Sequence, residues 1–409
     1  MQSYNPEQAL FQAKREFGEH GGVTPSIARS STFTVLDSIS MPEIFSGAKS
    51  PLKNDCYLYS RHYNPTNVVL ARYLSALEGT EAAITTASGM AAISCTLLQL
   101  CRQGDHIVAG STIYGGTHAL LKQVLPDMGI ETTLVDPTDP AAFERAITAR
   151  TKVFYVETLG NPTLRVADIP KLAQMAHRHN AKLVVDNTFT PALVTPSILG
   201  ADAVVYSLTK YVSGASDMIA GAICAGRELI DELKDLHTGR TMLLGPTMDP
   251  RAAFDLIQRL PHLPIRMREH GRRAMVIATH LEQLGVAVTY PGLVTHPQHG
   301  LFTEMANQGY GFGGMMTVDC ITQDQADHFM NILQNEEQFG YIAVSLGYHD
   351  TLMSCSGSST SSEIPVEEQS EMGLSPGLVR ISVGYTGALE ERIQQMVRAV
   401  STAGLVNSE

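Results

Sequence analysis

The sequence lacks the features of several classes of protein. Among its 409 residues, no apolar run reaches the roughly 18 residues that a membrane-spanning helix needs. There is no long basic run and the formal net charge is −12, which argues against nucleic acid or an anionic membrane surface as a partner. The polar and charged opening, MQSYNPEQALFQAKREFGEH, does not have the pattern of a secretory signal.

Cysteines are few and scattered. None of the six forms a C-x-x-C pair or a spacing typical of a metal site, so we expect reduced, mostly buried thiols in a cytoplasmic protein. His296 and His299 lie close together, but no third ligand follows at a suitable spacing. We therefore expect two loop histidines with ordinary hydrogen bonds and no metal.

Short apolar runs alternate with segments of helical periodicity between about residues 66 and 207. The runs are EAAITTAS, DHIVAG, IETTLVD, TKVFYVE, AKLVVDN and DAVVYS. This alternation predicts an α/β fold, with a mostly parallel central sheet covered by helices on both faces. Ligands of such sheets bind at the carboxyl ends of the strands, so the residues that follow each run are the candidates for a site.

The regions on either side of this pattern differ from it. Residues 1–60 are rich in Gly, Ser and Pro and too polar to form a core, which predicts an irregular arm lying over another surface, with a neighbouring subunit as one candidate. The alternating region is expected to form a domain over 61–255. A long helix with a proline break follows, and mixed strands and helices then predict a smaller α+β domain over 256–409.

Two strand ends carry polar residues that suggest a site. Ser88, Gly89 and Met90 open a helix, where free backbone N–H groups and the helix dipole favour an anion such as phosphate, although Ser88 alone would be read as a simple N-cap. Asp186 directly follows a buried strand, where a carboxylate is costly unless it is paired. It either caps a turn or holds a cation.

A third strand end completes the set. After DAVVY come Ser207, Thr209 and Lys210. The two hydroxyls and the Ser88–Met90 turn are suited to bind one phosphate, and Asp186 is suited to pair with a protonated ring nitrogen. The Lys210 amine is suited to form a Schiff base with an aldehyde. An anion, a ring cation and an aldehyde in one small molecule describe pyridoxal 5′-phosphate.

The motifs resemble those of the Cys/Met-metabolism (trans-sulfuration) family of pyridoxal-phosphate enzymes over nearly the whole chain. They are YSRHYNPT at 59–66, SGMAAI at 88–93, ETLGNPT at 157–163, VVDNTF at 184–189, VVYSLTKYVSG at 204–214 and LVRISVG at 378–384. The resemblance implies the transferase-like fold called fold type I, in which 61–255 would be the cofactor-binding domain. It also implies a homo-oligomer, a dimer of dimers, with active sites shared between subunits.

The resemblance also implies roles for individual residues. Lys210 would be the Schiff-base lysine and proton shuttle, and Tyr114 would stack on the cofactor ring and protonate the leaving sulfur. Tyr114, Ser345 and Arg380 would bind the substrate, with Arg380 holding its carboxylate. The implied cofactor-binding residues are Tyr59, Arg61, Ser88, Gly89, Met90, Asn161, Asp186, Thr188, Ser207, Thr209 and Lys210. Of these, Tyr59 and Arg61 would reach the phosphate of a neighbouring subunit.

Within the family, segments such as IYGGTHALL and LGPTMDP are most similar to the plant-type methionine γ-lyases. This implies γ-elimination of L-methionine to methanethiol, 2-oxobutanoate and ammonia. Two positions depart from relatives: Gly116 stands where several bacterial methionine γ-lyases carry a cysteine, and Ala215 where many relatives carry a histidine. A cystathionine γ-lyase, or a γ-replacing sulfhydrylase or synthase acting on acylated homoserine, therefore stays open. The intact Tyr114, Asp186 and Lys210 speak against a non-catalytic protein.

Overall fold

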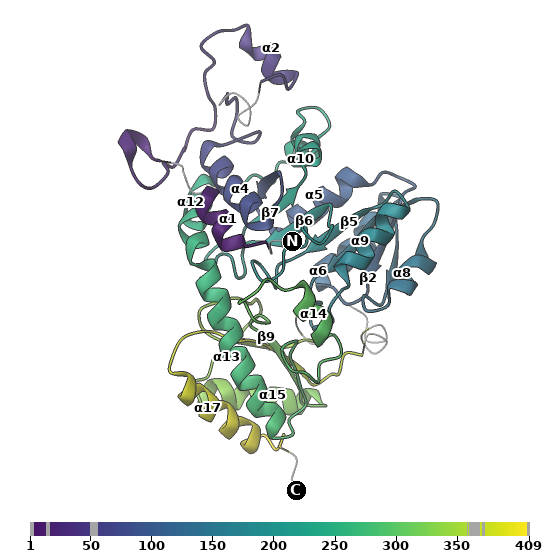
Figure 1. Ribbon diagram of the computed structural model, residues 1–409, viewed down its shortest axis with the longest axis vertical. Coiled ribbons are helices and arrows are strands. Elements are labelled where there is room, and N and C mark those ends of the chain that lie inside the picture. The colour runs from purple at the N-terminus through teal and green to yellow at the C-terminus, as the bar shows by residue number, and fades with distance from the viewer. Residues whose placement is uncertain are drawn as a thin grey trace.

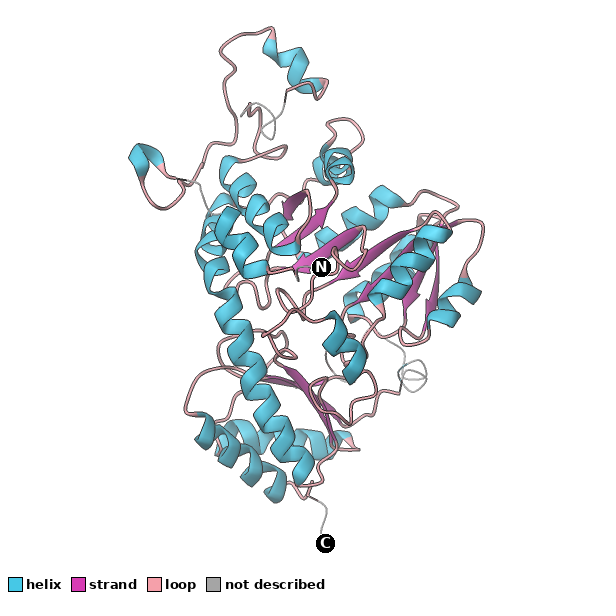
Figure 2. Ribbon diagram, in the orientation of Figure 1, coloured by secondary structure: helices cyan, strands magenta, loops and turns pink. Residues whose placement is uncertain are grey.

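The computed structural model describes residues 4–13, 17–49, 56–357, 359, 369 and 373–406. Two β-sheets form its two halves, and the long helix α13 (Leu263–Gln283) extends from the first toward the second (Figures 1 and 2). Residue 255, where the sequence analysis ended the first domain, lies within α12 (Pro250–Arg259), which packs on α4 (Pro65–Glu78) of the larger half. The division into domains stays a prediction.

The larger sheet has seven strands in the order β1-β7-β6-β5-β4-β2-β3. Its strands are β1 (Ala82–Thr86), β2 (His106–Gly110), β3 (Glu131–Val135), β4 (Thr151–Glu157), β5 (Lys182–Asp186), β6 (Ala203–Ser207) and β7 (Gly221–Ala225). Strands β2 to β6 pair in parallel, and β7 runs antiparallel to both of its neighbours. The predicted mostly parallel sheet is confirmed. Strand β7 was missed, because its sequence, GAICA, is short and poor in β-branched residues.

Alternate residues of the central strands face opposite layers of helices. Along β5, Leu183 and Val185 pack into one core with residues of α4, α9 and α12, whereas Val184 packs into the other core with residues of α5 and α10. Both faces are therefore buried, which explains why these strands read as continuous apolar runs. The remaining helices of this half are α5 (Gly89–Leu100), α6 (Gly115–Ala119), π-helical η2 (Leu120–Val124), α7 (Leu125–Asp127), α8 (Pro140–Ala146), α9 (Ile169–Arg178), α10 (Arg227–Lys234) and α11 (Arg240–Leu244).

The helices begin where the sequence supplies capping groups. The Asn64 side chain accepts the backbone N–H of Thr66 at the start of α4, and Pro65 occupies the first helical position. Asp168 caps α9 in the same way, and its side chain accepts the N–H of Lys171. These local signals mark where each of the two helices begins.

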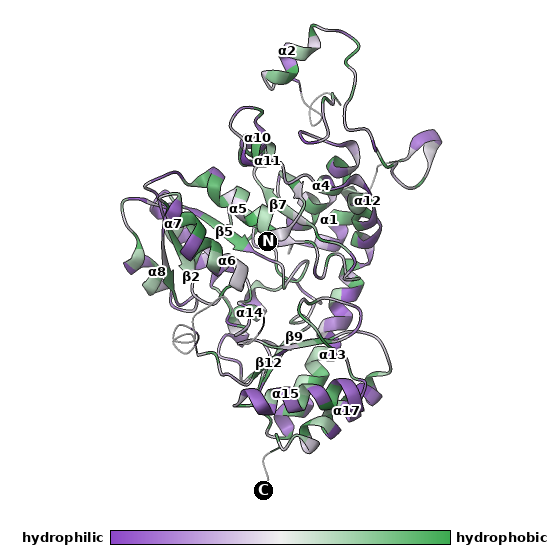
Figure 3. Ribbon diagram, turned by 180° about the vertical axis from the view of Figure 1, so that it is seen from behind, coloured by the Kyte–Doolittle hydropathy of each residue, from purple (hydrophilic) through white to green (hydrophobic). Residues whose placement is uncertain are grey.

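The smaller half has a five-stranded sheet in the order β10-β11-β12-β9-β8. Its strands are β8 (Val288–Thr289), β9 (Met315–Asp319), β10 (Tyr341–Ile342), β11 (Leu352–Cys355) and β12 (Leu378–Ser382). All pairs are antiparallel except β10 with β11. The short η3 (Leu260–His262) precedes α13 and contacts α12 of the larger half, and the helical segments that follow α13 are α14 (His299–Met305), α15 (Gln323–Asn331), η4 (Ile332–Glu336) and α17 (Leu389–Thr402). Figure 3 shows hydrophilic residues on the exposed helix α17 and hydrophobic residues on strands such as β5 and β7. This half is the predicted second α+β unit.

The N-terminal arm is not irregular throughout. Helix α1 (Pro6–Ala13) packs on α4 and buries Leu10, so the prediction of an irregular segment is wrong there. Beyond it lie η1 (Glu19–Gly21) and α2 (Ser40–Phe45), which extend away from the body of the molecule (Figure 1). Their neighbourhood carries exposed apolar side chains: Phe17, Val23, Leu36, Ile39 and Phe45. Among the described helices, none is long and apolar enough to cross a membrane.

Candidate active site

A cavity of about 310 Å³ opens at the carboxyl ends of the parallel strands, facing the smaller sheet. Apart from Tyr59 and Arg61, every residue that the sequence analysis assigned to the site lines it. These are Ser88, Gly89, Met90, Tyr114, Asn161, Asp186, Thr188, Ser207, Thr209, Lys210, Ser345 and Arg380. Most come from strand ends of the larger sheet, whereas Ser345 and Arg380 come from the smaller half. The site therefore lies between the two halves.

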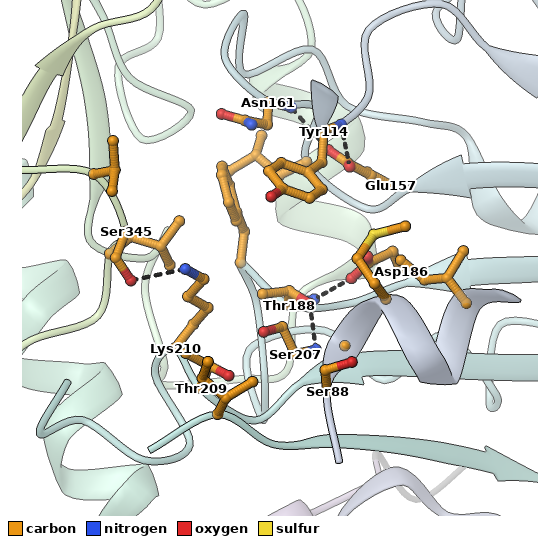
Figure 4. Close-up of a pocket in the computed structure, with 18 of the residues that line it drawn as sticks. Ser88, Tyr114, Glu157, Asn161, Asp186, Thr188, Ser207, Thr209, Lys210 and Ser345 are labelled. Atoms are coloured by element: carbon orange, nitrogen blue, oxygen red, sulfur yellow. Dashed lines mark hydrogen bonds between the residues drawn. The ribbon is translucent and has the colours of Figure 1, made fainter. Parts of the chain in front are cut away.

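Lys210 projects into this cavity from the turn that follows β6 (Figure 4). Its Nζ atom donates a hydrogen bond of 2.7 Å to Oγ of Ser345. Burial, with a smaller contribution from the charge of Arg380, lowers the pKa of Lys210 to about 8. A larger fraction of this amine is therefore neutral near neutral pH than for an exposed lysine. A neutral amine is the form that attacks a carbonyl carbon or accepts a proton.

The N-terminus of α5 approaches the end of β6 very closely. Ser88 caps the helix, and its Oγ atom accepts the N–H of Ala91 at 3.1 Å. A Cβ atom at Gly89 would lie 2.7 Å from Cβ of Ser207, so only glycine fits here. Thr188 Oγ1 accepts the N–H of Ser207 at 2.9 Å, which joins a third segment to the cluster. Backbone N–H groups and hydroxyls thus converge in a cradle that suits an anion.

Asp186 is buried at the end of β5. Its Oδ1 atom accepts the N–H of Thr188 at 2.9 Å, and its Oδ2 atom accepts a longer bond from the hydroxyl of Tyr155 at 3.4 Å. Burial raises the pKa of Asp186 above its ordinary value. The sequence analysis left a turn cap and a cation site as alternatives. The carboxylate caps the turn and also lines the cavity, where a cation would stabilise its charge.

Arg380 lies in β12 with only 3% of its surface exposed. One Nη atom donates to Oδ1 of Asn161 at 2.8 Å, and the other donates to the carbonyl oxygen of Ser345 at 3.0 Å. Ser345 adopts a φ of +88°, a region that favours glycine, so its backbone is strained. Among the described residues its hydrogen-bond acceptors are neutral, and a buried guanidinium in such surroundings is an attractive site for a carboxylate.

Tyr114 stands at the start of α6 and points into the cavity, with 42% of its surface exposed (Figure 4). Its ring lies against the backbone of Gly116. A Cβ atom at this glycine would be 2.6 Å from Cε1 of Tyr114 and 3.4 Å from Sδ of Met90. Any side chain at position 116 would therefore displace the ring.

Glu157 lines the cavity but was missed by the sequence analysis. It ends β4 and pairs in register with Asp186 of β5, so two buried carboxylates lie side by side. Burial and the charge of Asp186 raise the pKa of Glu157 above its ordinary value. The signal was present in the sequence, because Glu157 follows the apolar run KVFYV just as Asp186 follows KLVV.

Tyr59 and Arg61 lie outside this cavity. Arg61 donates from Nη1 to the carbonyl oxygen of Met242 at 2.9 Å, and its guanidinium lies 5.7 Å from the centre of the Tyr59 ring. Tyr59 has 43% of its surface exposed. Both side chains therefore lie at the surface of the larger half, away from the cavity of their own chain.

His296 lies in a loop as predicted, whereas His299 is the first residue of α14, so the prediction of a loop is wrong there; both make ordinary hydrogen bonds. Nε2 of His296 donates to the carbonyl oxygen of Leu164 at 3.1 Å, and Nδ1 of His299 donates to that of Pro291 at 2.9 Å. Over the part of the chain that the structure describes, no group of three or more His, Cys, Asp or Glu side chains is arranged to hold a metal ion.

Comparison with known proteins agrees with this geometry. The model of the family described as Cys/Met metabolism PLP-dependent enzyme matches residues 8–399. A methionine γ-lyase of Arabidopsis thaliana is 53% identical over 397 residues, which cover 97% of this chain and 90% of that protein.

Solved structures of similar proteins share the fold. A cystathionine γ-lyase from Lactobacillus plantarum, complexed with L-serine, superposes with a TM-score of 0.86 at 30% identity, over 98% of this chain and all of that one. A putative O-acetylhomoserine (thiol)-lyase from Campylobacter jejuni superposes with a TM-score of 0.88 at 26% identity, over 97% of this chain and all of that one. The latter carries a pyridoxyl-lysine phosphate.

Proposed function

Because the chain belongs to the Cys/Met-metabolism family of pyridoxal-phosphate-dependent enzymes, we propose that it cleaves L-methionine by γ-elimination. Methionine and water would yield methanethiol, 2-oxobutanoate and ammonia. The observation that carries this proposal is the 53% identity to a methionine γ-lyase over 97% of the chain.

The cavity fits pyridoxal phosphate in each of its parts. The close approach at Gly89 opens a cradle of donors for a phosphate, from the start of α5 and from Ser207 and Thr209. Asp186 offers a buried carboxylate to a protonated ring nitrogen. Lys210 offers an amine whose pKa is lowered to about 8 and would hold the cofactor covalently through Nζ. Met90, Asn161 and Thr188 would complete the cofactor's surroundings.

Bound pyridoxal phosphate supplies an electron sink for the negative charge that develops when a proton leaves Cα of the substrate. Asp186 would keep the ring nitrogen protonated, which that sink requires. Lys210 would accept the Cα proton at Nζ and return it at a later step, and Ser345 Oγ orients this amine through the 2.7 Å hydrogen bond. The Tyr114 hydroxyl would protonate the departing sulfur atom.

The substrate would be held at both ends. Arg380 still has N–H groups beyond the two that bind Asn161 and Ser345, and these would bind the substrate carboxylate. The other end would face an apolar wall formed by Leu159, Phe189, Ile219, Val344 and Leu346. Such a wall suits the methylthio group of methionine.

A second candidate comes from the same family. Cystathionine carries a further ammonium and carboxylate beyond its sulfur, and acylated homoserine carries an ester. Among the described residues that line the cavity, the charged side chains are Glu157, Asp186, Lys210 and Arg380. The last three have the roles given above and Glu157 accepts the backbone N–H groups of Tyr114 and Asn161, which leaves no charged group dedicated to a second charged end. Gly116 and the similarity to a cystathionine γ-lyase keep these substrates as the alternative.

We further propose a homo-oligomer, a dimer of dimers in the cytoplasm, in which the arm over residues 1–60 covers a neighbouring subunit. Both cations that line the cavity, Lys210 and Arg380, have other proposed roles, so neither is left for the phosphate. Arg61 and Tyr59, near the base of the arm and outside their own cavity, are suited to reach the phosphate of a second copy. The exposed apolar side chains of the arm support the same assembly.

The test is a panel of substrates offered to the purified holoenzyme. Methionine should release methanethiol and 2-oxobutanoate in equal amounts. Its rate of turnover should exceed that of cystathionine and that of an acylated homoserine supplied together with a thiol. If the enzyme cleaves cystathionine and leaves methionine intact, the second candidate function replaces the first. Borohydride should fix the cofactor on Lys210, and Lys210→Ala should lower turnover by at least about a hundredfold.

A further inference from the structure

The buried carboxylate of Glu157 joins two segments of chain that carry proposed site residues. Its Oε1 atom accepts the backbone N–H of Tyr114 at 2.7 Å, and its Oε2 atom accepts the backbone N–H of Asn161 at 2.9 Å. Figure 4 shows Glu157 beside Tyr114, at the edge of the cavity. Both oxygens are therefore engaged by main-chain donors, which fixes the start of α6 relative to the turn after β4.

The connection continues into the smaller half of the molecule. The side chain of Asn161, whose backbone Glu157 holds, accepts a hydrogen bond of 2.8 Å from Nη1 of Arg380 in β12. Glu157 is thus two contacts away from the guanidinium that is proposed to bind the substrate carboxylate. It is one contact away from the backbone of Tyr114, the proposed acid.

No ion pair joins the carboxylate of Glu157 to the guanidinium of Arg380. Over the described part of the chain, Arg380 forms no ion pair with a carboxylate, and its hydrogen bonds go to the neutral oxygens of Asn161 and Ser345. The two oxygens of Glu157 accept backbone N–H groups, so this nearby carboxylate attracts the guanidinium through space without a direct ion pair. Arg380 therefore stays available for a carboxylate that enters the cavity.

We propose that Glu157 is a positioning residue that holds the Tyr114 ring and, through Asn161, the Arg380 guanidinium in place around Lys210. This inference rests on the proposed function, because the roles of Tyr114 and Arg380 do. Glu157 itself need not touch the substrate. Its effect on substrate binding should therefore pass through Asn161, and its effect on turnover through Tyr114.

The variant Glu157→Gln tests this directly, because an amide keeps the shape but turns one acceptor oxygen into a donor that faces a backbone N–H. Glycine, which has an amine and a carboxylate but nothing to eliminate, serves as the probe, and its binding to the holoenzyme is followed by the visible absorbance of the cofactor. We expect the Kd for glycine to rise about tenfold and kcat for methionine to fall about tenfold. Asp202→Asn is the matched control, since Asp202 also accepts a backbone N–H, that of Leu183 at 2.8 Å, at the opposite end of the strands.

A double-mutant cycle separates an effect transmitted through Asn161 from a nonspecific effect of the substitution on the structure. In an Asn161→Ala background the route to Arg380 is already broken, so adding Glu157→Gln should change the Kd for glycine by less than about twofold. Glu157→Asp, which keeps the charge but is one methylene shorter, should act in the same direction as Glu157→Gln, because it cannot reach both N–H groups.

The outcomes are distinct. The role of Glu157 would be overturned if folded Glu157→Gln and Glu157→Asp bound glycine with a Kd within twofold of the wild-type value, or if the effects in the cycle were additive. In that case the wild type would still cleave methionine. A wild-type protein with no visible cofactor band, or with no methanethiol release from methionine, would instead overturn the proposed function, and this inference with it.

Discussion

The Nζ atom of Lys210 and the Oγ atom of Ser345 lie 2.7 Å apart, although the two residues belong to different halves of the molecule. The backbones of the two halves also approach closely here, since a Cβ atom at Gly347 would lie 2.5 Å from the backbone nitrogen of Tyr211. The segment 345–347 therefore packs directly on the turn that carries the lysine. The position of the amine depends on how the two halves meet.

Removing this hydroxyl should slow turnover without unfolding the protein. In Ser345→Ala the Lys210 amine loses its acceptor, and the loss of one hydrogen bond, about 1 kcal/mol, corresponds to about a fivefold lower kcat. Steady-state kinetics with methionine would measure it. Ser354→Ala is the control, because Ser354 pairs with Arg380 in the neighbouring strand and its buried hydroxyl has no hydrogen-bond partner among the described residues. Equal kcat values in the two variants would contradict a role for the Ser345 hydroxyl.

A methyl group at Gly89 should weaken cofactor binding. In Gly89→Ala the new Cβ atom would lie 2.7 Å from Cβ of Ser207, so α5 or β6 must shift and the donor cradle must open. We expect the Kd for pyridoxal phosphate, measured by titrating the apoprotein, to rise at least about tenfold. Gly300→Ala in α14 should leave it unchanged, because nothing lies within 4 Å of a Cβ there.

The lowered pKa of Lys210 predicts how the apoprotein captures its cofactor. Only the neutral amine attacks the aldehyde, so the rate of attachment should rise with pH and level off above about pH 8, well below the ordinary lysine pKa of 10.5. Stopped-flow absorbance at a series of pH values would give the midpoint.

Arg380→Met should move that midpoint upward, because it removes the positive charge that assists burial in lowering the pKa of Lys210. Arg398→Met, which removes a surface charge bound to Glu337, should not move it. A wild-type midpoint above pH 10 would show that the amine is not desolvated.

The arm should contribute to self-association. Leu36 is fully exposed within the chain and Ile39 is largely exposed, so a partner surface would bury both. A charge at either position, as in Leu36→Asp, should shift the protein toward smaller species in sedimentation velocity. Val294→Asp introduces the same charge at an equally exposed apolar residue away from the arm and should leave the distribution unchanged. An unaltered distribution for both arm variants would place the interface elsewhere.

Much of the larger half could be read from the sequence, because its signals are local. The apolar runs that became β2, β4, β5 and β6 report burial on both faces, and capping residues mark where helices such as α4 and α9 begin. Asp186, Ser207 and Lys210 were found from the residues alone, since Asp186 and Ser207 end buried strands, Lys210 lies in the turn after β6, and parallel strands end at one edge. Ser345 and Arg380 were found only by resemblance to a family, because nothing in their neighbourhood of the sequence distinguishes them from ordinary strand and loop residues.

The sequence by itself determined which segments become buried strands and which chemical groups stand at their ends. Tertiary structure alone decided that Arg380 meets Asn161, that Ser345 meets Lys210, and that Glu157 spans the backbones of Tyr114 and Asn161. The physical reason is the separation along the chain over which each interaction acts. A hydrophobic period or a helix cap acts over a few neighbouring residues, whereas a contact between residues 161 and 380 exists only after two separately folded layers have packed together.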